Sequence, residues 1–403
     1  MISVDEARDV ILSSIPILPS EEVALLDALY RVLDEDVYSD SNIPPFDNSA
    51  MDGYAIRAAD VGRASAENPV ILDVLEDLAA GYVAGQAVGE GQAIRIMTGA
   101  PMPQGADSVV KVEETERSNG SVKVFRSVKR GENVRLAGED VRVGELVLTK
   151  GKLLGPGDVG MLASIGKASI KVIRRPRVAV IATGDELVDV GEPLAPGKIR
   201  NSNAYSIGAQ VLEAGAIPLM VGIARDRRND LVEKIERGLE ADILITSGGV
   251  SVGDYDLVKQ VLAELGEVVL WKVAMKPGKP LAFGVIQDKP LFGLPGYPTS
   301  SMVSFEQFVR PAILKMSGRS DLKRPEIQVV LEDRVVKKPG RRHYLRAVLE
   351  RKDGEVHAKL TSSQKSGSLK PMTVANALLV IPEDATAIEP GEKVTAQLIR
   401  ELT

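Results

Sequence analysis

The strongest constraint on the fold is an alternation of apolar strands and amphipathic helices that begins at residue 177. Each apolar run ends in glycine or polar residues, and the stretches that follow the first three runs carry apolar residues at helical spacing. This alternation is typical of an α/β domain whose parallel sheet lies between two layers of helices. The apolar runs are RVAVIATG (177–184), PLMVGIAR (218–225), ADILITSGG (241–249), VVLWKVAM (268–275), PLAFGVI (280–286) and PLFGLPG (290–296).

Different patterns flank this region. Short β-like runs punctuated by glycine dominate residues 69–150, which predicts a small, mostly β module. Strand-like runs return after Lys323 and predict a C-terminal β-barrel or sandwich. Apolar residues at helical spacing predict helices over 4–15, 21–33, 153–166 and 299–316.

Composition excludes several kinds of site. The 403 residues include no cysteine, which removes disulfides, zinc–thiolate sites, iron–sulfur clusters and thiol nucleophiles. Two histidines are too few for a histidine-rich metal site, so any metal would be a hard cation such as magnesium on oxygen ligands. A net charge of −6 argues against bulk attraction to nucleic acid or to anionic lipid. Without a signal-peptide pattern or an apolar run of membrane-spanning length, the sequence predicts a cytoplasmic protein.

Polar loops follow the apolar runs, at the sheet edge where open parallel sheets bind ligands. The SGG and LPG turns can present backbone N–H groups to an anion, and the helix after the LPG turn adds its dipole. Lys276 and Lys279 offer positive charge to phosphate. Glu186, Asp226 and Asp256 could hold magnesium or pair with donors on a heterocycle. The loops are GDELV (184–188), Arg225-Asp226, SGGVSVGDYD (247–256), KPGKP (276–280) and LPGYPTSS (294–301).

Plainer roles remain open for some of these side chains. Asp185 could cap the helix that follows the first strand, and Asp254 or Asp256 could cap the third helix, since aspartate is favoured at that position. Lys276 and Lys279 could be ordinary surface lysines.

A second unusual stretch is IPPFDNSAMDGYAIR (43–57). Its two prolines and its glycine would interrupt a helix or a strand. Its aromatic and aliphatic residues offer contacts that a solvated linker lacks. The sequence therefore predicts an ordered loop that carries carboxylates.

Together these motifs resemble the molybdopterin molybdenumtransferase family, the MoeA-type enzymes that share their fold with the E domain of gephyrin. The matching stretches occur in family order and span nearly the whole chain. They are PPFDNSAMDGYAIR (44–57), IMTGAPMPQGAD (96–107), RLAGEDV (135–141), ATGDEL (182–187), SNAYSI (202–207), TSGGVSVGDYD (246–256), KPGKPLAFG (276–284) and GLPGYPTSSMVSFEQFV (293–309).

The resemblance implies a multidomain α/β plus β fold. The subunit would be elongated and L-shaped, with a parallel-sheet α/β molybdopterin-binding domain, an inserted β-rich module and a C-terminal β-barrel. Residues 1–18 are a candidate to pack on the α/β domain. The implied parts are the N-terminal linking region (1–42 and 141–175), the inserted module (43–140), the α/β domain (176–318) and the barrel (319–403).

The resemblance also implies the final step of molybdenum cofactor assembly. Molybdate would be inserted into adenylylated molybdopterin, with release of AMP in a magnesium-dependent step. The family is homodimeric, with an active site between the α/β domain of one subunit and the β-rich part of the other. Molybdopterin adenylyltransferase is a candidate partner, whereas nucleic acid and membranes are not expected.

Residue roles follow from the matched positions. The implied catalytic set is Asp52, Thr98, Asp140, Glu186 and Asp226, with Glu186 and Asp226 as metal ligands. Because molybdate and phosphate are anions and this set is largely acidic, a cation such as Mg²⁺ must intervene. The implied binding residues are Arg135, Ser247, Gly248, Gly249, Ser251, Asp256, Lys276, Lys279, Pro295 and Pro298.

One turn departs from the family pattern. Tyr297 and Thr299 stand where many relatives carry Asn and Val, so direct contacts made by these side chains are in doubt. Gly296 and Pro298 remain, and the turn geometry is expected to survive.

Three alternatives stay open from the sequence. A molybdopterin adenylyltransferase resembles the α/β part but generally lacks the insert and the barrel. A gephyrin-like scaffold without catalysis would be expected to carry further domains and linkers. A tungsten-specific homologue is indistinguishable, because tungstate and molybdate have nearly the same size and charge.

Overall fold

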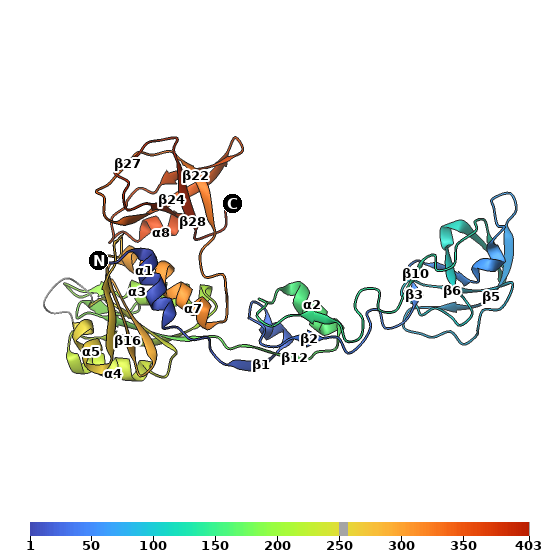
Figure 1. The fold of residues 1–403 in the computed structure, drawn as a ribbon, viewed down its shortest axis with the longest axis horizontal. Helices are drawn as coiled ribbons and strands as arrows, with labels where there is room; N and C mark the ends of the chain where they lie inside the picture. The colour runs from blue at the N-terminus through green and yellow to red at the C-terminus, as the bar shows by residue number, and fades with distance from the viewer. Residues whose placement is uncertain (250–256, 403) are drawn as a thin grey trace. The chain divides into compact units, whose positions relative to one another are not determined.

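The computed structural model describes residues 1–249 and 257–402. The chain forms two compact units (Figure 1). One unit comprises residues 1–21, 30–32 and 172–403, and the other comprises residues 22–29 and 33–171. The first contains the α/β domain and the C-terminal barrel, and the second is rich in β-strands.

A six-stranded sheet with the order β16-β13-β17-β21-β20-β18 is the centre of the α/β domain. Its strands are β13 (Arg177–Thr183), β16 (Ile217–Ala224), β17 (Ile243–Ser247), β18 (Glu267–Lys272), β20 (Pro280–Ile286) and β21 (Lys289–Leu294). Strands β16, β13, β17 and β21 are parallel, whereas β20 is antiparallel to both of its neighbours. The predicted parallel α/β sheet is confirmed, and the carboxyl ends of its parallel strands share one edge.

Helices cover both faces of this sheet (Figure 1). They are α1 (Val4–Ser13), α3 (Ser202–Glu213), α4 (Arg228–Gly238), α5 (Leu257–Leu265), α6 (Pro298–Ser304) and α7 (Arg310–Met316). On β13, Val178 and Val180 join a core with α1, α3, α6 and α7, while Ala179 and Ile181 join a core with α4 and α5. Successive strand residues point to opposite faces, so a strand that is apolar throughout requires both helix layers.

The helix expected over 299–316 forms with a π-helical turn, η4 (Phe305–Val309), between α6 and α7. Pro311 has no N–H, so the carbonyl of Gln307 four residues earlier lacks its α-helical donor. Arg8 of α1 takes that place, because its Nε donates to Gln307 O at 3.3 Å and its Nη2 to Gln307 Oε1 at 3.3 Å. The proline thus exposes a carbonyl that attaches α1 to the α/β domain.

The helix predicted over 21–33 does not form, so this prediction is wrong. This segment forms strand β1 (Ser20–Ala24), which pairs with β12 (Ser169–Ile173), and one short 3₁₀ turn, η1 (Leu25–Ala28). Tyr30 has a φ of 60°, which is incompatible with a right-handed helix. Leu26 is 83% exposed, so the helical spacing of apolar residues here does not correspond to a buried face.

The β-rich unit is built on a six-stranded sheet with the order β7-β4-β6-β5-β9-β8. Tyr54 and Ile56 of β4 fill one core and Ala55 fills another. Gly53 allows close strand pairing, because a Cβ there would lie 1.9 Å from Val110 O. The elements are β2 (Val37–Tyr38), β3 (Asn48–Ser49), β4 (Gly53–Ile56), η2 (Ala58–Val61), β5 (Val70–Leu78), β6 (Gln92–Ile96), β7 (Ser108–Lys111), η3 (Val112–Glu114), β8 (Thr115–Ser118), β9 (Ser121–Val124), β10 (Val134–Arg135), β11 (Leu146–Leu148) and α2 (Pro156–Ser164).

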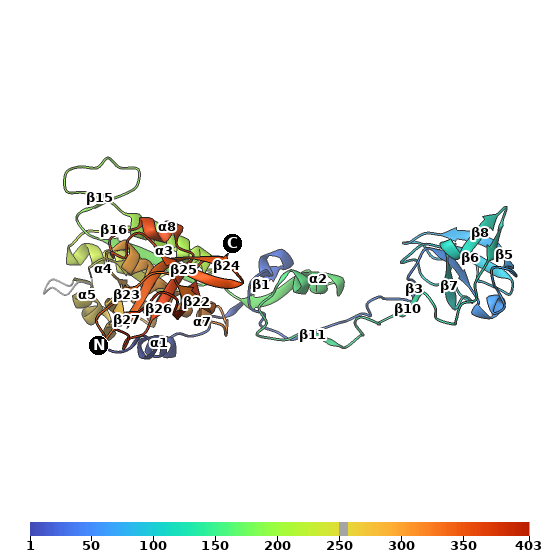
Figure 2. The same cartoon turned by 90° about the horizontal axis from the view of Figure 1, so that it is seen from above.

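The C-terminal domain is a closed barrel, as predicted. Its strands are β22 (Glu326–Leu331), β24 (Arg342–Lys352), β25 (Glu355–Leu360), β26 (Ala377–Ile381) and β28 (Lys393–Leu398). The barrel closes because β24 pairs with both β25 and β26 (Figure 2). The remaining elements of the first unit are β14 (Leu187–Val188), β15 (Ile199–Arg200), β19 (Met275–Lys276), β23 (Val335–Val336), α8 (Lys370–Val374) and β27 (Ala387–Ile388).

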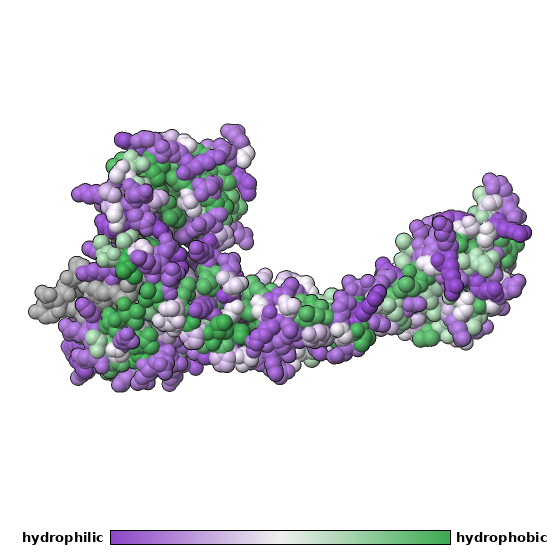
Figure 3. All heavy atoms as spheres, viewed as in Figure 1, coloured by the Kyte–Doolittle hydropathy of each residue, from purple (hydrophilic) through white to green (hydrophobic). Residues whose placement is uncertain are grey.

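Hydrophilic side chains cover much of the visible face of the α/β domain around α4 (Figure 3). Within residues 1–249 and 257–402, no helix is both long and apolar enough to cross a membrane.

Candidate functional site

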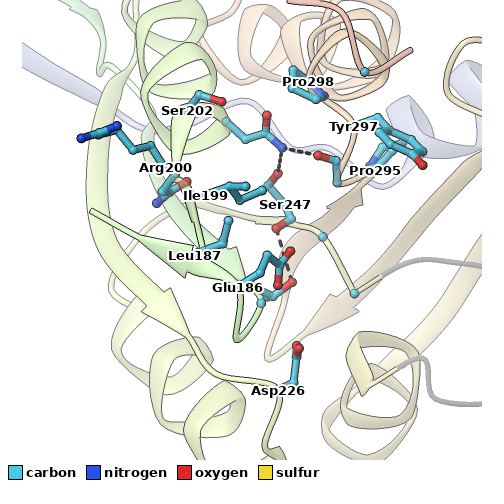
Figure 4. A pocket seen from close by; sticks show the side chains of 18 of the residues that line it. Glu186, Leu187, Ile199, Arg200, Ser202, Asp226, Ser247, Pro295, Tyr297 and Pro298 are labelled. Carbon is cyan, nitrogen blue, oxygen red and sulfur yellow. Dashed lines mark hydrogen bonds between the residues drawn. The ribbon is translucent and has the colours of Figure 1, made fainter. Parts of the chain in front are cut away.

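A cavity of about 960 Å³ opens at the carboxyl ends of β13, β17 and β21 (Figure 4). This is the sheet edge at which the sequence predicts a ligand site. The lining residues all belong to the first unit. The predicted catalytic and binding residues among them are Glu186, Asp226, Ser247, Gly248, Gly249, Pro295 and Pro298.

The glycine turn after β17 forms the floor of this cavity. Gly248 has a φ of +101°, and a Cβ there would lie 2.7 Å from both the carbonyl and the hydroxyl oxygen of Thr183. Gly248 N donates to Leu294 O at 3.0 Å, which ties the turn to the end of β21. Glycine is therefore required at this position for the neighbouring strand ends to come together.

Asn203 joins two turns of the cavity and is absent from the predicted site residues. Its Nδ2 donates to Ser247 Oγ at 2.9 Å and to Gly296 O at 2.8 Å. Asn201 caps α3 by accepting from Ala204 N at 3.2 Å, so the side chain two residues later is presented from the first turn of that helix. The only sequence signal for Asn203 is its position in the SNAYSI stretch directly after a strand.

Carboxylates form the acidic side of the cavity. The backbone N–H of Asp185 donates to Asp226 Oδ2, and the backbone N–H of Asp226 donates to Asp185 Oδ1. The alternative role of Asp185 as a helix cap is wrong, because Asn201 caps the next helix. Within the described residues, neither Glu186 nor Asp226 forms a salt bridge, so both carboxylates remain available to a ligand or a cation.

The donor set fits magnesium held together with a substrate. No group of three or more His, Asp or Glu side chains in the described part of the chain is placed to hold a metal alone. Mg²⁺ commonly uses one or two carboxylates and takes its other ligands from water and substrate phosphates. Glu186 and Asp226 meet that requirement, since both line the cavity and are exposed.

The two predicted lysines are not part of the cavity lining. Lys276 is exposed and lies in β19, where it pairs with His343 of the barrel strand β24. Lys279 is half-buried, and Val273 N donates to its carbonyl at 3.1 Å. Pro280, the next residue, does line the cavity. Ser251 and Asp256 lie outside the described residues.

Arg346 on β24 is not part of the cavity lining. Its side chain is buried, and its Nη1 and Nη2 donate to the carbonyls of Tyr344 and Ser363, each at 3.3 Å. Nε has no partner among the described residues. Burial lowers the pKa of Arg346 to about 10. A buried guanidinium that contacts only carbonyls is an unneutralised cation, and it therefore favours a nearby anion.

The remaining predicted residues belong to the β-rich unit. Asp52 Oδ1 accepts from the N–H and the hydroxyl of Thr98, both at 2.8 Å, and these bonds lower the pKa of Asp52. Arg135 on β10 pairs with Asn48 of β3. Asp140 N donates to Ile43 O at 3.0 Å. The side chains of Asp52, Thr98, Arg135 and Asp140 are all exposed.

Comparison with known proteins agrees with this architecture. Residues 2–166 match the MoeA N-terminal region (domain I and II), residues 179–315 match the probable molybdopterin binding domain, and residues 328–399 match the MoeA C-terminal region (domain IV). A molybdopterin molybdenumtransferase of Bacillus subtilis is 41% identical over 95% of this chain and 90% of its own length. The chain belongs to the molybdopterin molybdenumtransferase family.

Further relatives support this assignment. A molybdopterin molybdenumtransferase of a Nostoc species is 40% identical over 98% of this chain and 93% of its own length. The crystal structure of the molybdopterin biosynthesis MoeA protein from Pyrococcus horikosii superposes with a TM-score of 0.84 at 35% identity, covering 100% of both chains. The family assignment therefore extends over the α/β domain, the β-rich unit and the barrel.

Proposed function

We propose that the chain inserts molybdate, or tungstate, into adenylylated molybdopterin and releases AMP in a magnesium-dependent reaction. Family membership makes it a transferase of molybdenum cofactor biosynthesis. The observation that carries the finer proposal is the cavity at the strand ends. There, Glu186 and Asp226 face a glycine turn that can contact an anion through its backbone.

Each group has a defined role in this proposal. Glu186 and Asp226 hold magnesium, which supplies the positive charge that a phosphoanhydride needs beside carboxylates. Because the N–H of Gly248 is bonded to Leu294 O, the phosphates are oriented by the backbone N–H of Gly249, the next residue of the turn. Lys276 and Lys279 lie outside the cavity lining and attract the oxyanion through their charge at a distance.

We further propose a homodimer in which the β-rich unit of one subunit completes the cavity of the other. Asp52, Thr98, Arg135 and Asp140 belong to the β-rich unit, whereas every lining residue of the cavity belongs to the first unit. A shared site would bring the two sets together. Molybdopterin adenylyltransferase, which makes the adenylylated substrate, is the proposed partner for substrate transfer.

The decisive experiment incubates the chain with adenylylated molybdopterin, magnesium and either molybdate or tungstate. AMP release and metal retained on molybdopterin are measured together. We expect both to depend on magnesium and on an oxyanion. If no AMP is released in the presence of molybdate or in the presence of tungstate, the proposed reaction is wrong.

A further inference from the structure

Thr299 connects the α/β cavity to a segment of the barrel. The barrel segment is defined here as residues 363–368. Thr299 is fully buried, and its N–H donates to Ser366 O at 3.1 Å. Its hydroxyl donates to Ser368 O at 2.7 Å. Both bonds come from the first turn of α6, directly after the LPG turn, so they attach the barrel segment to the edge of the cavity.

Tyr297 lies close to the same segment. A Cβ on Gly367 would lie 3.5 Å from Cδ1 of the Tyr297 ring, which is an ordinary van der Waals contact. Both residues line the cavity. The Tyr297 side chain is largely exposed. Tyr297 and Gly367 therefore lie next to each other on the lining of the cavity.

The other side of the barrel segment is fixed to β24. Gln364 accepts from Arg346 N at 3.0 Å through its Oε1 and donates to Arg346 O at 2.9 Å through its Nε2. Arg346 Nη2 donates to Ser363 O, as described above. The barrel segment is thus held by the barrel on one side and by Thr299 on the other.

We propose that Thr299 and Tyr297 are positioning residues that make the barrel segment a fixed wall of the cavity. The wall would raise the affinity for the nucleotide part of the substrate, and this assignment of the occupant rests on the proposed function.

The test compares two near-isosteric substitutions at one buried position. Thr299→Val keeps the shape and removes the hydroxyl, whereas Thr299→Ser keeps the hydroxyl and removes the methyl group. AMP binding in the presence of Mg²⁺ is measured by calorimetry. We expect Thr299→Val to weaken binding about fivefold, from the loss of one hydrogen bond, and Thr299→Ser to stay within about twofold of the parent. Equal affinities of the two variants, or an unchanged affinity in Thr299→Val, would overturn the proposal.

A second measurement tests whether Thr299 fixes the barrel segment, independently of which ligand the cavity binds. Hydrogen exchange of residues 363–368 is followed in the absence of any ligand. We expect faster exchange in Thr299→Val and parental exchange in Thr299→Ser, even if the protein proves not to bind AMP. If residues 363–368 exchange in Thr299→Val at the parental rate, the proposal that Thr299 fixes the barrel segment is refuted. If they exchange faster in Thr299→Val but the parent does not bind AMP, only the proposed function is refuted.

Tyr297 is tested in the same way. Tyr297→Phe keeps the ring, and we expect parental affinity for AMP and Mg²⁺. Tyr297→Ala removes the ring beside Gly367, and we expect a higher KM for the adenylylated substrate with an unchanged kcat. A loss confined to kcat, or the same loss in Tyr297→Phe, would contradict a positioning role.

Discussion

Asp185 and Asp226 bind each other across the ends of two neighbouring strands. Asp185 N lies 3.1 Å from Asp226 Oδ2, and Asp226 N lies 3.2 Å from Asp185 Oδ1. Asp185 follows β13, and Asp226 follows β16. This exchange ties two loops together at the cavity, so Asp226 has a structural role in addition to its proposed role with magnesium.

A substitution of Glu186 tests the proposed magnesium role without disturbing the two hydrogen bonds between Asp185 and Asp226. Glu186→Gln removes a charge that has no salt-bridge partner among the described residues, so we expect parental thermal stability. Because the charge would hold magnesium, we expect AMP release to fall on the order of 100-fold. Glu192→Gln, a matched change at an exposed position of the following loop, should leave the rate unchanged. A parental rate in Glu186→Gln at saturating magnesium would contradict the assignment.

Gly248 provides a test of the glycine turn. Gly248→Ala places a Cβ 2.7 Å from two oxygen atoms of Thr183 at a positive φ, so we expect a loss of stability of about 2 kcal/mol or more. Gly296→Ala is the control, because its Cβ would lie at an ordinary 3.6 Å from Gly248 Cα. Denaturant unfolding measures both. Equal destabilisation by the two substitutions would show that the close approach at Gly248 is not what requires glycine.

The pKa of the Asp52 carboxyl group should depend on the side chain at position 98. Two hydrogen bonds from Thr98 hold the pKa of Asp52 below its ordinary value. Thr98→Val removes one of them, so we expect the pKa of Asp52 to rise, while Thr98→Ser should leave it unchanged. Carboxyl-detected NMR titration measures the change. An unchanged pKa in Thr98→Val would mean that the backbone N–H of residue 98 alone sets the value.

The strand ends of the cavity could be predicted because sheet topology places them together. Once four parallel strands are assigned, Glu186, Asp226 and Ser247 must share one edge, whatever the details of the loops. Side chains that arrive from a helix or from another domain carry no such signal. Asn203 reaches Ser247 and Gly296 through the packing of α3, and its place in the SNAYSI stretch after a strand is the only local signal for it.

Secondary structure could be predicted wherever the apolar pattern reflects burial. The pattern over 21–33 resembles a helix, yet Leu26 is exposed and the backbone of β1 pairs with β12. Pairing with a strand almost 150 residues away overrides local spacing, and no local pattern records it. For the same reason, the loop sequence around Lys276 predicts a place beside the cavity, whereas in the structure Lys276 pairs with the barrel strand β24.

His343 should make the first unit sensitive to acid. It is buried on β24 beside Lys276, Lys337 and Arg341, and burial together with these cations lowers its pKa from 6.5 to about 4. Below pH 6.5 the unfolded state therefore binds more protons than the folded state, so stability falls as the pH drops from about 6.5 to about 4. The loss amounts to about 3 kcal/mol by linkage.

Denaturant unfolding at pH 7 and pH 4 measures this effect. The difference between the two pH values should be smaller by that amount in His343→Gln than in the parent. His357→Gln, a change of the other histidine, serves as the control and should keep the parental difference. If the difference is the same in His343→Gln and in the parent, His343 is not the group that titrates.

A shared active site predicts complementation between two inactive variants. Asp52→Asn removes a carboxylate charge from the β-rich unit, and Glu186→Gln removes one from the cavity, so each homodimer should be inactive. In a mixed dimer, the intact cavity of the Asp52→Asn subunit meets the intact β-rich unit of the Glu186→Gln subunit, which restores one of the two sites. After random exchange half of the dimers are mixed, so we expect about a quarter of the parental AMP release. Mixing Asp52→Asn with Asp140→Asn, two changes in the same unit, should restore nothing. No recovery in the first mixture, once subunit exchange is verified, would place each complete site within a single subunit.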